Sequence, residues 1–125
     1  MKNEKRAYPR LKASHPDAHW QRIEGYTSTG AFDINACVHG REVWIESKDG
    51  TVPKHANGLV RCKVRPSQVA WEHLRRQAGG RTFLAILVGD RLFIIRGQYI
   101  AVVKKGVTIP WLVTHDVGVE SIFAL

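Results

Sequence analysis

Residues 30–48, GAFDINACVHGREVWIESK, decide the fold that this chain is predicted to adopt. From Phe32 to His39 apolar residues alternate with polar ones. His39-Gly40 then turns the chain, and residues 42–48 run back with an apolar centre at 43–45. Side chains of a strand alternate between its two faces. The pattern therefore predicts two short antiparallel strands joined by a tight turn.

This hairpin gathers three charged side chains. Glu46 and Lys48 lie two positions apart on the returning strand, so they share one face. Asp33 lies at the far end of the first strand, and a turn at Gly40 brings it beside Glu46. Carboxylates are hard oxygen ligands for a divalent cation, which polarises a phosphorus centre and activates a bound water. A lysine beside them can orient that water or offset charge on the phosphate.

Asp33 followed by Glu46-Ser47-Lys48 resembles the D…(D/E)xK signature of the PD-(D/E)XK nuclease superfamily. Within it, the chain is most similar to small phage and resolvase-like members, near the VRR-NUC and Holliday-junction resolvase groups. Two positions depart from the usual pattern: Phe32 stands where proline is frequent, and Ser47 stands where an apolar residue is usual. The resemblance covers about residues 20–95.

A second match lies downstream, on a helix predicted over residues 66–78. Pro66 suits a first helical turn, and Gly79-Gly80 end the helix. Helical spacing predicts a buried face formed by Val69, Ala70, Leu74 and Ala78. In the resembling families a glutamine opens this helix and reaches the active site, which implies that role for Gln68. The segment fits their "lysine … Q-x-x-W … aGG" rhythm, although a lone glutamine here is more often a capping or solvent-facing amide.

The remaining patterns complete an α/β (α+β) fold. Residues 19–24 predict a short strand, 82–88 a strand buried on both faces, and 91–95 a strand returning from a turn at 89–90. The strand, helix, strand order of 41–48, 66–78 and 82–88 implies a parallel crossover. The expected result is a mixed sheet with an early β-hairpin, flanked by helices, and the resemblance implies a restriction-endonuclease-like core.

The length of 125 residues predicts one nuclease domain. Within this domain we expect a basic N-terminal arm or helix at 1–18, a catalytic core at 19–95 and a C-terminal extension at 96–125. Pro9 and Pro16 argue against one long first helix. In the extension, residues 99–103 are either helix or strand, 104–106 form a basic turn, and a hydrophobic tail from Pro110 packs on the core or makes a dimer contact.

Composition indicates the partner and the compartment. The chain has 19 Lys and Arg against 11 Asp and Glu, a net charge of +8, which favours a polyanion such as nucleic acid. No apolar run is long enough to span a membrane, no secretory signal is visible, and two cysteines imply no disulfide framework. We expect a cytoplasmic protein, in the cytoplasm of a bacterial host if it is phage-encoded.

Basic residues recur at every second position before the helix. Arg61, Lys63 and Arg65 alternate with Cys62 and Val64, which puts three cations on one face of an extended segment. Together with Lys5 and Arg6 of the N-terminal region, they are the residues that we expect to contact a nucleic-acid backbone.

Other readings of the same residues stay open. Glu24 is either an extra metal ligand or a surface carboxylate paired with Arg22. A binding protein could keep this fold without catalysis, although the intact acidic and lysine residues argue against it. A zinc site would have to use residues whose spacings match no common finger: Cys37, His39, His55 and Cys62.

The resemblance implies a mechanism as well as a fold. Asp33, Glu46 and the backbone carbonyl of Ser47 would hold one or two Mg²⁺ ions, for which Mn²⁺ could substitute. Lys48 would position or help deprotonate the attacking water, and Gln68 would orient Lys48, the water or the phosphate. The expected function is an endonuclease on duplex or branched DNA, structure-selective because no base-reading element is visible, and a homodimer would let two sites cut two strands.

Overall fold

The computed structural model describes residues 6–23 and 29–124. Its centre is a five-stranded sheet with the strand order β1-β2-β3-β4-β5. The strands are β1 (His19–Arg22), β2 (Ile34–Val38), β3 (Arg41–Asp49), β4 (Thr82–Val88) and β5 (Arg91–Arg96). All neighbours are antiparallel except β3 and β4, which are parallel. The predicted mixed sheet with its parallel crossover is therefore confirmed.

The β2–β3 hairpin has the register that the alternation predicts. Ile34 pairs with Ile45, and Val38 pairs with Arg41, so the next position places Asp33 opposite Glu46. His39 and Gly40 both have positive φ angles, of 51° and 78°, as a two-residue turn between twisted strands requires.

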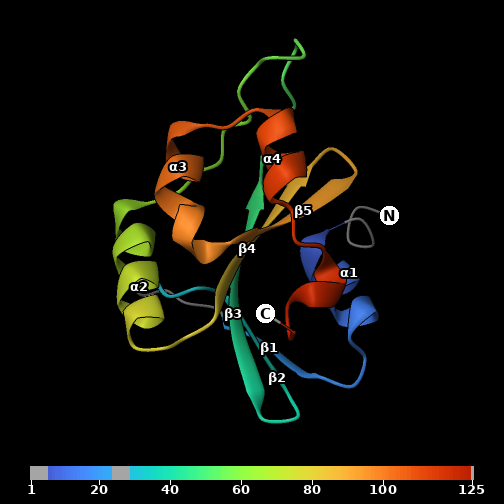
Figure 1. The fold of residues 1–125 in the computed structure, drawn as a ribbon, viewed down its shortest axis with the longest axis vertical. Helices are drawn as coiled ribbons and strands as arrows, with labels where there is room; N and C mark the ends of the chain where they lie inside the picture. The colour runs from blue at the N-terminus through green and yellow to red at the C-terminus, as the bar shows by residue number, and fades with distance from the viewer. Residues whose placement is uncertain (1–5, 24–28, 125) are drawn as a thin grey trace.

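Helices cover both faces of the sheet (Figure 1). The helices α2 (Pro66–Gln77), α3 (Ile100–Lys105) and α4 (Ile109–His115) pack with one hydrophobic cluster. Helix α1 (Ala7–Ser14) and the 3-10 turn η3 (Val119–Ser121) pack with the other. Strand β4 lies between them, with Leu84 and Ile86 in the first cluster and Phe83 and Ala85 in the second. This burial on both faces was predicted.

The N-terminal region contains a helix rather than only an extended arm. In α1, Pro9 is the third residue, in the first turn, where a missing N–H leaves no intrahelical bond unmade. Ala7 and Leu11 of this helix are buried against the sheet. The apolar residues of the segment therefore dock it onto the second cluster.

Of the four residues predicted to form the buried face of α2, Val69 is half-buried and packs against the first cluster, but the prediction is wrong for the other three. Ala70 and Ala78 are exposed, and Leu74 is 66% exposed. The buried residues of this helix are two polar ones, Gln68 at 2% and Glu72 at 1% exposure. Helical spacing found the period of the helix but assigned most of the inner face to the wrong residues.

Gln68 and Glu72 can be buried because they have hydrogen-bond partners inside the protein. The apolar contact between α2 and the sheet is made by an aromatic residue, Trp71. The indole of Trp71 packs 4.9 Å from the ring of Phe32 and 5.5 Å from that of Trp44, measured between ring centroids. Glu72 accepts hydrogen bonds from Arg76 and Thr82. A buried polar group that keeps its hydrogen bonds avoids most of the cost of leaving water.

The C-terminal segment is helical and folds back onto the sheet. Residues 97–99 form the 3-10 turn η2 (Gly97–Tyr99), which leads into α3. The basic turn predicted at 104–106 is wrong, because Lys104 and Lys105 form the last turn of α3 and Gly106 ends it with a φ of 106°. Ile122 and Phe123 are buried in the second cluster, so the tail packs on the core. In the described residues, no helix is long and apolar enough to cross a membrane.

Candidate active site

Asp33 and Glu46 meet at the end of the β2–β3 hairpin, as the register predicted. The backbone N–H of Asp33 donates a hydrogen bond of 3.1 Å to Oε1 of Glu46. The N–H of Ser47 donates to Oδ1 of Asp33 at 3.4 Å. Phe32, immediately before Asp33, is fully buried in the first cluster. The buried ring of Phe32 anchors the chain immediately before Asp33 in the core.

Lys48 and Gln68 converge on the other oxygen of Glu46. Nζ of Lys48 lies 3.4 Å from Oε2 of Glu46, and Nε2 of Gln68 donates a buried hydrogen bond of 2.9 Å to the same oxygen. The amide oxygen of Gln68 accepts from the backbone N–H of Arg65 at 3.0 Å. Gln68 therefore caps the start of α2 and also contacts Glu46.

Gly30 allows the chain before the hairpin to pack closely against the start of α2. A Cβ built on Gly30 would lie 2.1 Å from the backbone oxygen of Ser67 and 2.7 Å from the nitrogen of Gln68. Its φ of 79° also favours glycine. The chain leading to Asp33 can pack this closely on the helix only because position 30 lacks a side chain.

Glu46 has an unusual electrostatic environment. Its side chain is buried, and the residue is 6% exposed. Burial raises the pKa of Glu46 to about 7, and the nearby charge of Asp33 contributes to this rise. Lys48 opposes the shift by favouring the charged form. The single lysine does not offset both the loss of water and the second carboxylate.

This donor set fits a hard divalent cation. Two carboxylates lie side by side, and the backbone of Ser47, the residue after Glu46, contacts Asp33. A cation between the carboxylates would relieve the repulsion that raises the Glu46 pKa. In the described part of the chain, no group of three or more His, Cys, Asp and Glu side chains is arranged to hold a metal. A cation here would therefore depend on Asp33, Glu46, a backbone oxygen, water and substrate.

Arg22, which the sequence indicates only as a possible partner of Glu24, lies near the site. One of its guanidinium nitrogens lies 3.9 Å from Oδ2 of Asp33, and the guanidinium also lies over the ring of Tyr8. The signal that could have found it is the β1–β2 register, in which Arg22 pairs with Ile34, next to Asp33.

A small cavity of about 110 Å³ opens beside Arg22. Its lining consists of residues of α1, β1 and β3 and the residue before α1: Arg6, Ala7, Tyr8, Arg22, Ser47 and Asp49. A nitrogen of Arg6 lies 3.7 Å from an oxygen of Asp49. Arg6 is therefore close to the candidate site, whereas Lys5 and Glu24 lie outside the described residues.

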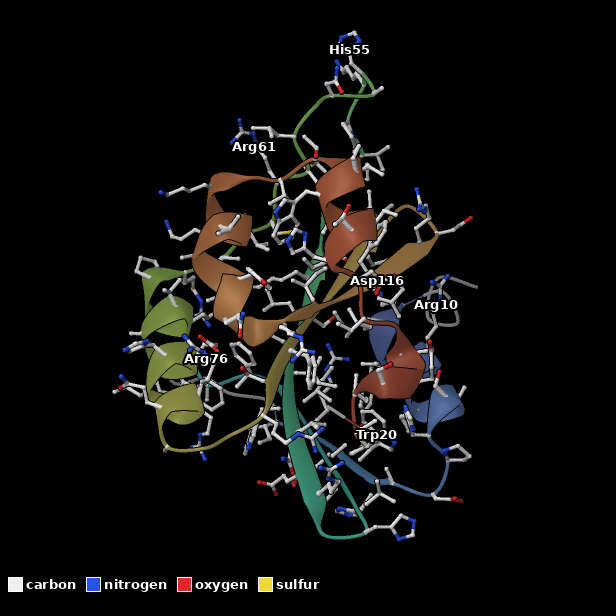
Figure 2. All side chains as sticks on the ribbon, in the orientation of Figure 1. Arg10, Trp20, His55, Arg61, Arg76 and Asp116 are labelled. Atoms are coloured by element: carbon white, nitrogen blue, oxygen red, sulfur yellow. The ribbon has the colours of Figure 1, made fainter. Side chains whose placement is uncertain are left out.

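The three alternating cations lie on the surface next to the start of α2. Arg61, Lys63 and Arg65 are exposed, while Val64 is buried between two of them. Within the described residues no ion pair or hydrogen bond joins these three side chains to Asp33 or Glu46. Arg61 lies toward the end of the molecule that carries the loop after β3, whose tip is at His55 (Figure 2).

The four residues of the zinc alternative are not assembled. His39 lies in the β2–β3 turn at one end of the sheet, and His55 lies at the tip of the loop beyond the other end (Figures 1 and 2). No group of three or more His, Cys, Asp and Glu side chains in the described residues is arranged to hold a metal. Across residues 6–23 and 29–124 the zinc alternative has no support.

No family model matches this chain, and no curated protein sequence matches it. Among solved structures it is similar to that of Archaeoglobus fulgidus Hjc, a Holliday junction resolvase from an archaeal hyperthermophile. The TM-score is 0.52 and the identity 14%, over 91% of this chain and 98% of that chain. At this identity the likeness concerns the fold. The chain has a mixed α+β, restriction-endonuclease-like fold, as predicted from its sequence.

Proposed function

We propose that this chain is a metal-dependent endodeoxyribonuclease that hydrolyses DNA phosphodiesters and prefers branched DNA such as a four-way junction. The observation that carries the proposal is the convergence on Glu46. The backbone of Asp33, the ammonium of Lys48 and the amide of Gln68 all contact its carboxylate. They do so in a fold shared with a protein described as a Holliday junction resolvase.

Asp33, Glu46 and the backbone carbonyl of Ser47 would hold Mg²⁺, and Mn²⁺ could replace it. A bound cation would supply Lewis acidity at the phosphate and a lower pKa for a bound water. The buried Glu46 must be ionised to serve as a ligand. Because its pKa is about 7, it is only partly ionised at neutral pH. Cation binding and ionisation of Glu46 would therefore be coupled.

Lys48 and Gln68 would complete the reaction site. Lys48 carries a positive charge beside Glu46, where it could hold the attacking water or offset charge that develops on the phosphate. Gln68 fixes one carboxylate oxygen of Glu46, so that the carboxylate keeps its orientation. In-line attack of water on phosphorus would break the bond to the 3′ oxygen and leave a 5′-phosphate and a 3′-hydroxyl.

DNA binding would depend on phosphate contacts. The net charge of +8 and the exposed cations Arg61, Lys63 and Arg65 suit a polyanion. Contacts of this kind make affinity strongly dependent on salt and carry little sequence information. We expect recognition of DNA structure, and a homodimer would present two sites to two strands. A phage enzyme acting in the cytoplasm of its bacterial host is the setting that we propose.

The proposal is tested by cleavage of plasmid DNA and of a synthetic four-way junction in Mg²⁺, Mn²⁺ or EDTA. Wild type is compared with Lys48→Ala, and Lys104→Ala on the exposed face of α3 is the matched control. We expect cation-dependent cutting that falls by about 100-fold or more in Lys48→Ala, with DNA affinity nearly unchanged. The control should cut like wild type.

The product ends and the preferred substrate refine the result. Faster cutting of the junction than of a linear duplex of equal length would support structure selectivity. If wild type bound DNA in a salt-sensitive manner but cut nothing in either cation, the enzyme would be excluded and a DNA-binding protein of the same fold would remain.

A further inference from the structure

Two hollows open at the start of β4, at the end of the sheet that carries the β2–β3 turn. One has a volume of about 160 Å³ and the other about 430 Å³, and both are lined by Gly80 and Arg81. Because they share these residues, they adjoin each other. We call them together the arginine groove, after the five arginines that line them: Arg41, Arg75, Arg76, Arg81 and Arg96.

Positive charge in the arginine groove exceeds negative charge. Glu42 is the one carboxylate in the lining described for the two hollows. Glu72, buried beside Arg76, has its Oε2 occupied by Nε of Arg76 and the hydroxyl of Thr82. Among the described residues, the pair with Glu72 is the one ion pair that any of the five arginines forms. Arg41 donates a hydrogen bond of 2.7 Å to the backbone oxygen of Phe123, but within the described residues the groove has fewer acceptors than guanidinium donors.

Arg81, which both hollows share, shows this shortage most clearly. Its Nη2 donates a hydrogen bond of 2.6 Å to the backbone oxygen of Ile122. Its Nε and Nη1 are buried and have no hydrogen-bond partner in the described part of the chain. Burial lowers the pKa of Arg81, and the charge of Arg41 lowers it further. Buried donors without acceptors are costly, and an oxyanion in the groove would place a compensating negative charge beside this guanidinium.

Arg75 is held in place before any ligand arrives. Its guanidinium carbon lies 5.3 Å from the ring centre of Trp44 and 5.0 Å from that of Trp71. Stacking of this kind fixes the plane of a guanidinium and leaves its N–H groups free to bind. Planar guanidinium groups match the oxygens of a phosphate better than ammonium groups do.

Part of the arginine groove lies on the face of β3 that carries the candidate active site, whereas Arg41 lies on the opposite face, where its Nη1 donates to the backbone oxygen of Phe123. Trp44, Glu46 and Lys48 alternate along one face of this strand, and Trp44 lines the groove. At a rise of about 3.3 Å per residue, Trp44 lies about 7 Å and Arg41 about 17 Å along β3 from Glu46. One strand of a duplex carries a phosphate about every 3.4 Å along its axis. A strand with one phosphate at Glu46 could therefore present another to the groove a few nucleotides away.

We propose that the arginine groove binds a backbone phosphate of the same DNA whose scissile phosphate lies at Glu46. This inference rests on the proposed nuclease function, and it adds a second contact point at the opposite end of β3 from Lys48. A free phosphate or a phosphorylated small molecule offers the same chemistry, so the test separates the two sources.

The test uses full-length Lys48→Ala protein in EDTA, so that binding is measured without cleavage. Arg96→Gln removes an exposed arginine of the groove, and Arg91→Gln removes an exposed arginine at the other end of β5. Affinity for a 20-bp duplex is measured from about 50 to 200 mM salt. We expect Arg96→Gln to weaken binding about fivefold to tenfold and to reduce the salt slope by about one, with Arg91→Gln unchanged.

Each outcome has a distinct meaning. If Arg96→Gln and Arg91→Gln had the same affinity and slope as the parent, the groove assignment would be overturned while the proposed function stood. If the parent did not bind DNA at all, the proposed function itself would fail. Circular dichroism of both variants excludes loss of folding as the cause of weaker binding.

A second arm addresses free phosphate. The melting temperature of the parent and of Arg96→Gln is measured in inorganic phosphate and in chloride at equal ionic strength. Equal melting temperatures in the two salts, together with the reduced slope, support a DNA phosphate as the occupant. A rise in millimolar phosphate that Arg96→Gln abolishes, with DNA binding unaffected, would assign the groove to a free phosphate ligand and overturn the DNA assignment.

Discussion

Gln68 and Glu46 lie 22 residues apart in sequence and are joined by a buried hydrogen bond of 2.9 Å from Nε2 to Oε2. The same glutamine accepts from the backbone N–H of Arg65, the residue before α2. One side chain therefore couples the start of α2 to the carboxylate of the candidate active site. Its loss would leave the backbone N–H of Arg65 without this acceptor and would leave Oε2 of Glu46 with the contact to Lys48 alone among the described residues.

Gln68→Ala should lower both stability and activity. We expect the free energy of unfolding to fall by about 1–3 kcal/mol, because buried polar groups lose their partners. We also expect cleavage to fall by about tenfold to 100-fold, because the Glu46 carboxylate is no longer held in one orientation. Urea denaturation and the cleavage assay measure the two effects. Gln77→Ala, exposed at the end of the same helix, is the control; equal behaviour of the two variants would contradict this role.

The burial of Glu46 predicts a pH dependence of stability in EDTA. Its pKa is about 7 in the folded protein and near 4.5 when unfolded, so the folded state binds more protons between these values. The contribution of neutral Glu46 is complete below pH 4.5 and is lost as pH rises through 7, by on the order of 1–3 kcal/mol. Glu46→Gln should remove this slope, as measured by urea denaturation at a series of pH values.

Mg²⁺ should act on the same group in the opposite direction. A cation bound by ionised Glu46 stabilises the folded protein, so its effect on the melting temperature should be larger at pH 8 than at pH 5. Glu46→Gln and Asp33→Asn should each reduce this effect. An equal shift at both pH values, or one that both variants retain, would argue against these carboxylates as the ligands.

Two glycines offer a matched pair of substitutions. Gly30 and Gly40 have nearly the same φ, 79° and 78°, but a Cβ at Gly30 would lie 2.1 Å from the oxygen of Ser67, whereas one at Gly40 would meet no atom within 4 Å. Gly40→Ala should cost about 1–2 kcal/mol of stability from backbone strain alone. Gly30→Ala should cost more and should also reduce cleavage by displacing the start of α2. Comparable losses of stability, measured by urea denaturation, would show that the close packing at Gly30 is unimportant.

Thr82 stabilises the buried Glu72 carboxylate. Its hydroxyl donates a hydrogen bond of 2.7 Å to Oε2 of Glu72, so Thr82→Val should reduce the free energy of unfolding by about 1–3 kcal/mol. In the described part of the chain, the hydroxyl of Thr114 donates to the backbone oxygen of Pro110 in its own helix, and the residue is exposed. Thr114→Val should therefore change stability by less than about 0.5 kcal/mol. Denaturation curves of the two variants check the difference.

The hairpin and its pair of carboxylates could be predicted from the sequence, because a strand has a period of two and a turn at Gly40 leaves one register that buries Ile34 and Ile45. The same local rules predicted β4 and the parallel crossover. A strand that is apolar on both faces must lie inside the sheet, and a preceding helix of suitable length leaves few ways to connect it to the previous strand.

The inner face of α2 depends on contacts with residues that are distant in sequence. Helical spacing favoured Leu74, yet the fold buries Gln68 and Glu72, because Glu46 and Thr82 supply their partners from other strands. A local sequence pattern does not show which polar residue of the helix will find a buried hydrogen-bond partner, because that partner lies on another element of the fold.

The electrostatics of the candidate active site and the arginine groove also depend on residues that the tertiary structure brings together. The pKa of Glu46 depends on its burial and on Asp33, and the groove assembles residues 41, 75–76, 81 and 96 from four parts of the chain. Short-range periodicity was enough to assign residue types to the strands and to their two faces. The tertiary structure determined which charges lost water and which guanidinium groups lacked acceptors, because desolvation and pairing depend on neighbours in space.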